Sequence, residues 1–278
     1  MRQRPFAQVD VFTATPYRGN PVAVVLDADG LTADEMAGFA RWTNLSETTF
    51  VLPPTHADAD YRLRIFTPGG ELPFAGHPTL GSAHAWLEQG GMPRGVGGPV
   101  QECGIGLVAL RRVDGRLAFA APPLRRSGPV SPDVRDQVVR SLRVPDAAVE
   151  RCEWVDNGPE WIGVVLLDAR TVLDLRPDFA AMGSLKVGVL GFWDDTHDAD
   201  VEVRAFVPGI GVAEDPVTGS LNAGLARWLI PTGVLPARYT VGQGAALQRD
   251  GRVHVEQVGA DIWVGGDTVT CIDGTVRL

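Results

Sequence analysis

Apolar and polar residues alternate over short distances along much of the chain, which predicts more strands than helices. Runs rich in β-branched and aromatic residues are expected to be strands at positions 9–12, 22–26, 48–52 and 61–66. Residues 107–121 are expected to form a hairpin that turns at Asp114 and Gly115. Two more hairpins are expected near the end of the chain, at positions 249–251 and 273–274.

Three helices are indicated by their boundary signals. Thr32 and Glu35 have the spacing of a capping box, which predicts a helix from there to about position 43. Pro78 suits the first turn of a second helix, which ends at the glycine pair 90–91. A third helix is expected over residues 216–230. Because strands outnumber helices without a regular alternation of the two, the sequence favours an α+β fold over a doubly wound parallel sheet.

Two stretches of the chain repeat one another in order. The segment RIFTPGGELPFAGHPTLGS, from Arg64, matches RAFVPGIGVAEDPVTGS, from Arg204, and this alignment places His77 opposite Asp215. Upstream, GNPVAVV has a weaker echo in NGPEWIGVV. The ordered set of matches indicates a duplicated structural unit. We therefore expect a first unit at 1–125 and a second at 126–278, with the final strand packing back on the first.

Composition and charge exclude several classes of function. Hydrophobic residues make up 45% of the 278 residues and charged residues 21%, a mixture typical of a packed globular protein. A net charge of -9 without a basic run makes nucleic acid and anionic membranes poor candidates as partners. No apolar run approaches the roughly 20 residues of a membrane span, and no signal-peptide pattern opens the chain. We expect a cytoplasmic protein.

Metal and disulfide sites are not indicated either. The three cysteines, Cys103, Cys152 and Cys271, are an odd number, lie far apart and form no CxxC pair. The acidic segment at residues 194–200 has no fixed ligand spacing and is expected to be a solvated turn. We expect no metal and no cofactor.

The two repeated phrases contain candidate residues for binding a carboxylate. Each ends in Pro-x-x-Gly-Ser at a predicted helix start, where unpaired backbone amides and the helix dipole favour a carboxylate. A serine that merely caps the helix explains one copy equally well. Two such helix starts, one beside His77 and the other beside Asp215, are expected to converge on one pocket for a small carboxylate.

The motifs NLSETTFVL, ELPFAGHPTLG and VAEDPVTGS, in that order and after GNPVAV, resemble those of the PhzF family, named for the phenazine-biosynthesis isomerase. The resemblance spans nearly the whole chain. It implies the fold of diaminopimelate epimerase: two pseudo-symmetric units, each a mostly antiparallel sheet wrapped around a central helix, with the site in the cleft between them. It also implies a homodimer.

The resemblance further implies a mechanism and a set of residues. The family enzyme moves a proton between carbons of a cyclic diene carboxylate with a glutamate of its NLSE motif, which corresponds to Glu47, and without metal or cofactor. By the same correspondence, His77 and Asp215 complete the catalytic set. The expected substrate-binding residues are Asn20, Gly76, Gly219 and Ser220. Related epimerases use two cysteines at the helix starts, and none of the three cysteines here lies in either motif.

Two alternatives remain open at the level of sequence. One is a two-base epimerase or racemase in which Asp215 or His77 works opposite Glu47. The other is a small-molecule-binding or regulatory protein that keeps the fold without turnover. A binding protein has no need of a carboxyl group that accepts and returns a proton, and this favours the single-carboxylate isomerase.

Overall fold

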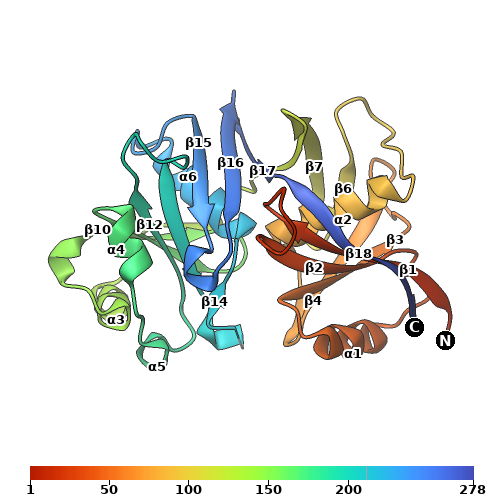
Figure 1. The fold of residues 1–278 in the computed structure, drawn as a ribbon, viewed down its shortest axis with the longest axis horizontal. Helices are drawn as coiled ribbons and strands as arrows, with labels where there is room; N and C mark the ends of the chain where they lie inside the picture. Colours follow the sequence, from red (N-terminus) through yellow and green to blue (C-terminus); the bar gives the residue numbers. More distant parts are fainter. Residues whose placement is uncertain (211) are drawn as a thin grey trace. The chain divides into compact units, whose positions relative to one another are not determined.

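The computed structural model describes residues 1–210 and 212–278 and divides the chain into two compact units (Figure 1). The first unit comprises Met1–Ala120 together with Gly265–Leu278, and the second comprises Ala121–Val264. The division thus falls a few residues before the boundary expected at 125, and the end of the chain belongs to the first unit. Among the described residues, no helix is both long enough and apolar enough to cross a bilayer.

The first unit is a sheet with two helices. Its strands are β1 (Gln3–Val11), β2 (Asn20–Val25), β3 (Glu47–Leu52), β4 (Tyr61–Thr67), β5 (Gly70–Leu72), β6 (Val100–Cys103), β7 (Gly106–Val113), β8 (Arg116–Ala120) and β18 (Thr268–Arg277). Its helices are α1 (Ala33–Thr43) and α2 (Gly76–Glu88). Paired strands run antiparallel, except that β2 pairs with β3 and β4 pairs with β6 in parallel.

The second unit has more helices around a similar sheet. Its strands are β9 (Arg126–Pro129), β10 (Val149–Asp156), β11 (Trp161–Leu166), β12 (Lys186–Phe192), β13 (Val201–Phe206), β14 (Glu214–Asp215), β15 (Arg238–Gln243) and β16 (Gly251–Val258); β17 (Asp261–Gly266) reaches the division between the units. Its helices are α3 (Pro132–Leu142), α4 (Ala169–Asp174), α5 (Phe179–Met182) and α6 (Gly219–Leu229), with short 3-10 turns at Asp146–Ala148, Pro208–Ile210 and Ala245–Leu247.

The two units share one order of strand pairing. In the first, β2 and β3 are parallel, β4 is antiparallel to β3 and β5, and β6 is parallel to β4. In the second, β11 and β12 are parallel, β13 is antiparallel to β12 and β14, and β15 is parallel to β13. The central helices α2 and α6 follow β5 and β14 and pack on their own sheets. This repeated topology is the α+β duplication that the sequence predicts.

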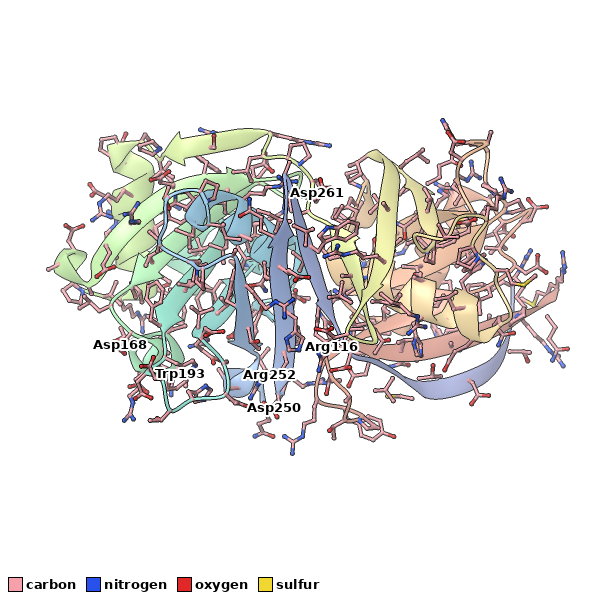
Figure 2. All side chains as sticks on the ribbon, turned by 90° about the horizontal axis from the view of Figure 1, so that it is seen from above. Arg116, Asp168, Trp193, Asp250, Arg252 and Asp261 are labelled. Carbon is pink, nitrogen blue, oxygen red and sulfur yellow. The ribbon has the colours of Figure 1, made fainter. Side chains whose placement is uncertain are left out.

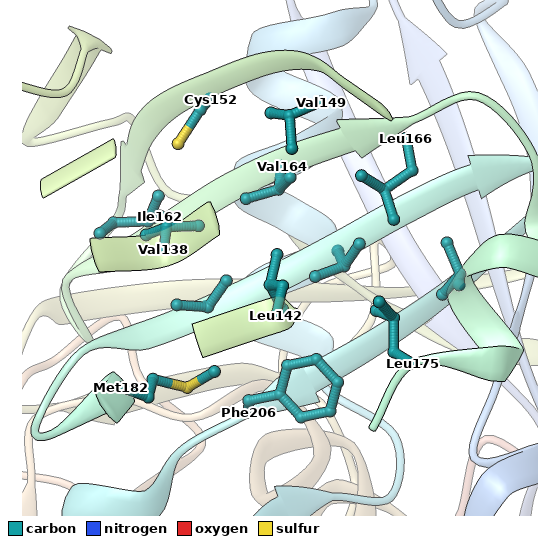
Figure 3. Packing of buried hydrophobic residues seen from close by; sticks show 13 residues of the cluster. Val138, Leu142, Val149, Cys152, Ile162, Val164, Leu166, Leu175, Met182 and Phe206 are labelled. Atoms are coloured by element: carbon teal, nitrogen blue, oxygen red, sulfur yellow. The ribbon is translucent and has the colours of Figure 1, made fainter. Parts of the chain in front are cut away.

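Each sheet packs a second apolar layer on the side away from its central helix. In the second unit this layer joins Val164, Val187 and Phe206 of the strands to Leu142 of α3 and Leu175 after α4 (Figure 3). In the first unit, Met36 of α1 packs with Phe50 and Phe66 of β3 and β4. Since alternate residues of a strand face opposite sides of a sheet, the residues between these positions face the central helix.

Of two local predictions from the sequence, one is confirmed by the structure and the other is wrong. The capping box of α1 is confirmed, because Thr32 accepts from the Glu35 amide and Glu35 accepts from the Thr32 amide. The hairpin predicted at residues 273–274 is wrong. Those residues lie inside β18, whose long pairing with β1 keeps the chain extended, with Gly274 opposite Phe6.

A forked arginine–glutamate pair fixes the true register between the two copies. Arg64 donates through Nε and Nη2 to the two carboxylate oxygens of Glu71, at 2.7 and 2.6 Å. Arg204 donates in the same way to Glu214, at 2.8 and 2.7 Å. Glu71 lies opposite Phe66 in β4, and Glu214 lies opposite Phe206 in β13, so the two pairs occupy one structural position.

This register corrects the alignment of the repeated phrases. Counting from Glu71 and Glu214, both copies place a proline, a helix-starting glycine and a second helix glycine at the same spacing, which makes Gly76 equivalent to Gly219 and Gly81 equivalent to Gly224. The counterpart of His77 is therefore Ser220, and Asp215 corresponds to a leucine of β5. The match of GHPTLGS with EDPVTGS is out of register, since Gly81 lies inside α2 whereas Gly219 begins α6.

The equivalent glycines allow each central helix to approach its sheet closely, and we expect Gly224→Ala to destabilise the protein. A Cβ atom there would lie 2.5 Å from the carbonyl oxygen of Val155. Because a backbone atom of a packed strand cannot easily move aside, the free energy of unfolding should fall by about 1–3 kcal/mol. Urea unfolding measures the change.

Gly38→Ala in α1 is the matched control, because the atom nearest to its Cβ would be 3.9 Å away. That variant should be neutral or more stable by up to about 1 kcal/mol, since alanine favours the helix. Equal stabilities of the two variants would contradict the close approach of α6.

Candidate active site

The first turn of α2 brings three of the predicted site residues together in the first unit. His77 is 3% exposed, and its Nδ1 lies 3.1 Å from the side-chain nitrogen of Asn20. Its Nε2 lies 3.3 Å from Oε2 of Glu47. Asn20 begins β2, Glu47 begins β3, and the two strands are parallel neighbours, so their first residues meet beside the helix start at Gly76.

Burial sets the protonation of this group. It lowers the pKa of His77 to about 3, and a backbone contact at Pro21 offsets part of the shift. The imidazole is therefore neutral at physiological pH, with one N–H and one lone pair. It can donate to one neighbour and accept from the other, which suits a ring held between an amide and a carboxyl group.

The alternation of β3 directs Glu47 toward α2. Thr49, two residues along, accepts a hydrogen bond from the hydroxyl of Ser82 in α2, at 2.8 Å. Phe50, on the opposite face, packs in the apolar layer against α1. Glu47 itself is 9% exposed, so its carboxyl group is mostly shielded from water near the N-terminus of α2.

The second unit holds the remaining predicted residues around the start of α6. The hydroxyl of Ser220 accepts from the indole Nε1 of Trp161 at 3.1 Å, and its carbonyl accepts from the side chain of Asn157 at 2.8 Å. Asp215 accepts a 2.5 Å hydrogen bond from the hydroxyl of Thr218, the residue that precedes the helix.

Gln243 organises the approach to α6. Its Oε1 accepts from the Thr218 amide and from the Asn222 side chain, both at 3.0 Å. Its Nε2 donates to the Thr218 hydroxyl at 3.0 Å and to the Asp215 carbonyl at 3.3 Å. These bonds tie the last residue of β15 to the segment that carries Asp215.

Both helix starts are suited to an anion. Neither α2 nor α6 has an acidic residue in its first turn, and neither has a side-chain cap bond. The first amides of each helix therefore have no acidic or capping side chain of their own helix to bind, and an electropositive helix start of this kind favours carboxylates. None of the three cysteines lies at these positions, and all three are free thiols.

The structure thus places Asn20, Glu47, Gly76 and His77 at one helix start, and Asp215, Gly219 and Ser220 at the other. Sequence reasoning missed Trp161, Asn157 and Gln243, which hold Ser220 and Asp215 in place. Asn157 and Trp161 lie in the NGPEWIGVV echo, which was the available signal. Gln243 had none, because its role depends on the return of β15 beside β13.

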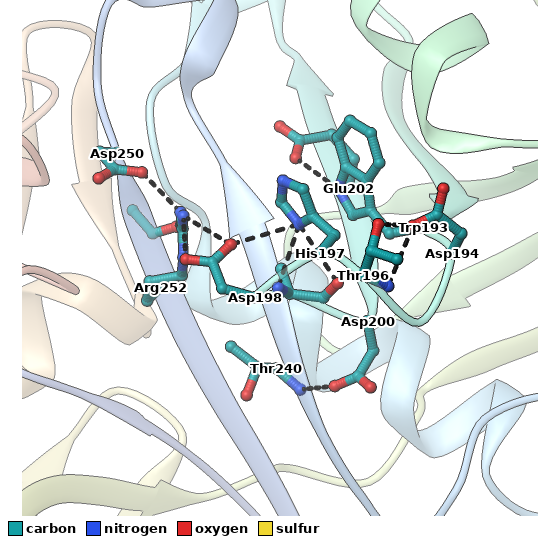
Figure 4. Close-up of polar contacts among 12 residues, drawn as sticks. Trp193, Asp194, Thr196, His197, Asp198, Asp200, Glu202, Thr240, Asp250 and Arg252 are labelled. Carbon is teal, nitrogen blue, oxygen red and sulfur yellow. Dashed lines mark hydrogen bonds and ion pairs between the residues drawn. The ribbon is translucent and has the colours of Figure 1, made fainter.

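The acidic turn between β12 and β13 is an independent polar cluster of the second unit (Figures 2 and 4). Trp193 and His197 stack with ring centroids 4.0 Å apart, and the Trp193 indole donates to buried Glu202 at 3.2 Å. Burial raises the pKa of Glu202. Arg252 of β16 bridges Asp198 of the turn and Asp250, so both carboxylates are already paired.

Comparisons with known proteins identify the family and the fold. Residues 9–274 match the family model described as phenazine biosynthesis-like protein, PhzC-PhzF. The chain is 38% identical to antisense-enhancing sequence 1 of Schizosaccharomyces pombe over 99% of both chains. It is 33% identical to trans-2,3-dihydro-3-hydroxyanthranilate isomerase of Pseudomonas chlororaphis, over 97% of this chain and 98% of the relative. A PhzF-family crystal structure from Enterococcus faecalis superposes with a TM-score of 0.81 at 25% identity, covering 100% of each chain.

The buried neutral His77 predicts a specific loss of stability in acid. Its pKa is about 3 in the folded protein against an ordinary value of 6.5, so between these values the unfolded chain binds a proton that the folded protein does not. Stability should therefore fall as the pH drops below about 6.5, by up to about 1.4 kcal/mol per pH unit from this group.

Urea unfolding of wild type and His77→Gln between pH 7.5 and 4.5 measures this contribution as the difference between two slopes. The variant cannot titrate at this position and should lose less stability. His56→Gln, which removes an exposed histidine, should keep the wild-type slope. A His77→Gln curve parallel to that of wild type would show that the ring is not held neutral.

Proposed function

Because the chain belongs to the PhzC-PhzF family of phenazine biosynthesis-like proteins and is an isomerase, we propose that it moves a proton within a small cyclic amino- or hydroxy-carboxylate, with Glu47 as the single acid and base. The observation that carries the proposal is the contact between the Glu47 carboxyl group and neutral His77, 3.3 Å apart beside Asn20 at the start of α2. A buried carboxyl group beside a buried imidazole at a helix start is the kind of arrangement that marks functional sites.

The reaction needs one group that takes a proton and gives it back. In the proposed step, the Glu47 carboxylate removes a proton from a ring carbon, and the electron pair of that C–H bond enters the conjugated system. The same carboxyl group then returns the proton to a carbon at the other end of that system. No electrons leave the substrate, so the step needs neither a redox cofactor nor a co-substrate.

The neighbours of Glu47 give it a suitable setting. Low exposure strengthens its interaction with His77, and a carboxyl group in an apolar setting is better matched to proton transfer near neutrality. Because the Asn20 amide nitrogen donates to Nδ1, the ring proton of neutral His77 lies on Nε2, which can donate to an oxygen of the Glu47 carboxyl group in either protonation state. Asn20 fixes the far side of the ring.

We also propose a substrate-binding role for the residues of α6. The amides of Gly219 and Ser220 suit its carboxylate, and Gly76 offers similar donors at α2. The Asp215 carboxylate, held by Thr218, suits an amino or hydroxyl group. The relative from P. chlororaphis is named for trans-2,3-dihydro-3-hydroxyanthranilate, which carries all three groups and is the first compound to test.

We expect Glu47→Gln to abolish turnover while leaving ligand binding nearly unchanged. The amide keeps the size and much of the hydrogen bonding of the carboxyl group but cannot accept and return a proton. If acid/base catalysis supplies its usual share, kcat should fall by about 10²–10⁴-fold. Steady-state kinetics and calorimetric titration of the purified variant measure the two effects separately.

Glu150→Gln, an exposed change of the same kind, should keep wild-type kinetics. His77→Ala and Ser220→Ala should weaken binding together with rate, since these side chains hold the substrate. A Glu47→Gln variant with wild-type turnover would contradict the single-carboxylate mechanism, and the acid/base role would then have to be assigned to Asp215 or His77.

Solvent deuterium distinguishes the isomerase from the epimerase. In D₂O, a single carboxyl group should deliver deuterium to one carbon and one face of the product, because the proton returns from the side that Glu47 occupies. Mass spectrometry and NMR of the product measure its position. Inversion at the carbon that lost its proton would instead establish two bases on opposite faces. If the substrate exchanged hydrogen for deuterium without forming product, only the proton-abstraction step of the proposal would stand.

A further inference from the structure

Lys186 occupies, in the second unit, the position that Glu47 occupies in the first. Glu47 precedes Thr48, which lies opposite Phe66, and Lys186 precedes Val187, which lies opposite Phe206. The two phenylalanines are equivalent because each follows the arginine of a forked pair. Both residues also begin a strand that pairs in parallel with the preceding one, β3 with β2 and β12 with β11.

The side chain of Lys186 lies on the α6 face of its sheet. Leu185 and Val187, on either side of it, pack in the apolar layer that faces α3 to α5. Gly188, two residues along, is the glycine whose Cβ would lie 2.2 Å from Leu221 in the first turn of α6. Alternation therefore directs Lys186 toward the helix, as it directs Glu47 toward α2.

The neighbour of Lys186 on β11 already reaches the candidate site. Lys186 lies opposite Trp161, whose indole donates to the hydroxyl of Ser220. Side chains of directly paired strand residues lie about 5 Å apart, and lysine is long enough to extend past that distance. A lysine at this position is thus long enough to extend toward Gly219 and Ser220 at the start of α6.

The positive charge of Lys186 has no ion-pair partner among the described residues. It is the only lysine in the sequence and is half-buried. Among residues 1–210 and 212–278, its side chain makes no hydrogen bond and no ion pair, although most arginines of the second unit do. A half-buried ammonium group beside a helix whose first turn carries no acidic residue suits an anion that arrives from outside.

We propose that Lys186 binds the carboxylate of the substrate together with the first amides of α6, so that it determines specificity for acids. The duplication has then put opposite charges at one structural position: a proton-transfer group in the first unit and an anion-binding group in the second. This inference rests on the proposed function for the identity of the substrate, but the binding of a carboxylate can be tested without turnover.

The experiment compares two probes that differ only in the carboxylate. 3-Hydroxyanthranilate is the aromatic acid with the substituents of the proposed substrate, and 2-aminophenol is the same molecule without its carboxylate. Calorimetric titration of wild type, Lys186→Met and Lys186→Arg with each probe isolates the role of the charge. Arg170→Met is the matched control, because it removes an exposed positive charge on α4, which packs on β12 and β13 from the other side.

Lys186→Met should weaken binding of 3-hydroxyanthranilate by about 10- to 100-fold, the usual cost of a charge-assisted hydrogen bond, and leave 2-aminophenol unchanged. Lys186→Arg should restore most of the difference, and Arg170→Met should match wild type. With trans-2,3-dihydro-3-hydroxyanthranilate as substrate, Lys186→Met should raise KM by a similar factor and change kcat by less than about threefold. Thermal unfolding confirms that each variant is folded.

The outcomes separate this inference from the proposed function. A wild type that binds the acid no better than 2-aminophenol overturns it, and so does a Lys186→Met variant that keeps wild-type affinity for the acid. Carboxylate-dependent binding that is lost in Lys186→Met supports it even if no isomerase activity is found, in which case only the proposed reaction fails. A folded Lys186→Met variant that loses kcat with unchanged KM would also overturn it.

Discussion

The forked pair between arginine and glutamate in each unit is the interaction on which the site geometry depends. In the second unit Arg204 and Glu214 are almost fully buried, and the remaining Arg204 donor also reaches the carbonyls of Val172, Leu173 and Leu175. Breaking such a pair by removing one partner costs about 3–5 kcal/mol, because the other charge is left buried. The pair therefore holds β13 and β14 in one register, and the helix start follows a fixed number of residues later.

That constraint explains how one scaffold can carry two different kinds of chemistry. The strand before the pair and the helix after it are positioned in the same way in both units, so equivalent positions can change residue type without changing the fold. At the helix start, His77 has Ser220 as its counterpart, and at the strand start, Glu47 has Lys186. In the proposed mechanism, the first unit supplies the buried groups that transfer the proton, and the second supplies the hydroxyl, amide and ammonium donors that bind the carboxylate.

Burial is the second physical factor, and its extent differs between the two units: His77 in the first is fully buried, whereas Lys186 in the second is only half-buried. Burial keeps His77 uncharged, so that the ring can hold Glu47 without neutralising it as a fixed counter-ion would. Lys186 is only half-buried and keeps contact with water, which lowers the cost of carrying a charge before a ligand binds. The same layer architecture therefore suits both proposed roles, proton transfer by Glu47 in one copy and anion binding by Lys186 in the other.

The sequence by itself determined the α+β class, the duplication, the capping box of α1 and the identity of most residues at the two helix starts. The fold class and the capping box follow from local patterns, since capping, strand alternation and turn composition depend on residues close together in the chain. The duplication follows from the repeated phrases, and the residues of the helix starts follow from those phrases and the family resemblance. Only the tertiary structure decided the register of the duplication. Gly-Ser and x-Pro pairs recur by chance, so the phrases GHPTLGS and EDPVTGS align well although Gly81 and Gly219 occupy different turns of their helices. The correct equivalence depends on which glutamate pairs with which arginine across a hairpin, and hence on long-range strand pairing.

For the same reason Gln243 and Lys186 could not be found from local pattern: their positions beside α6 arise only when β15 and β12 enter the sheet.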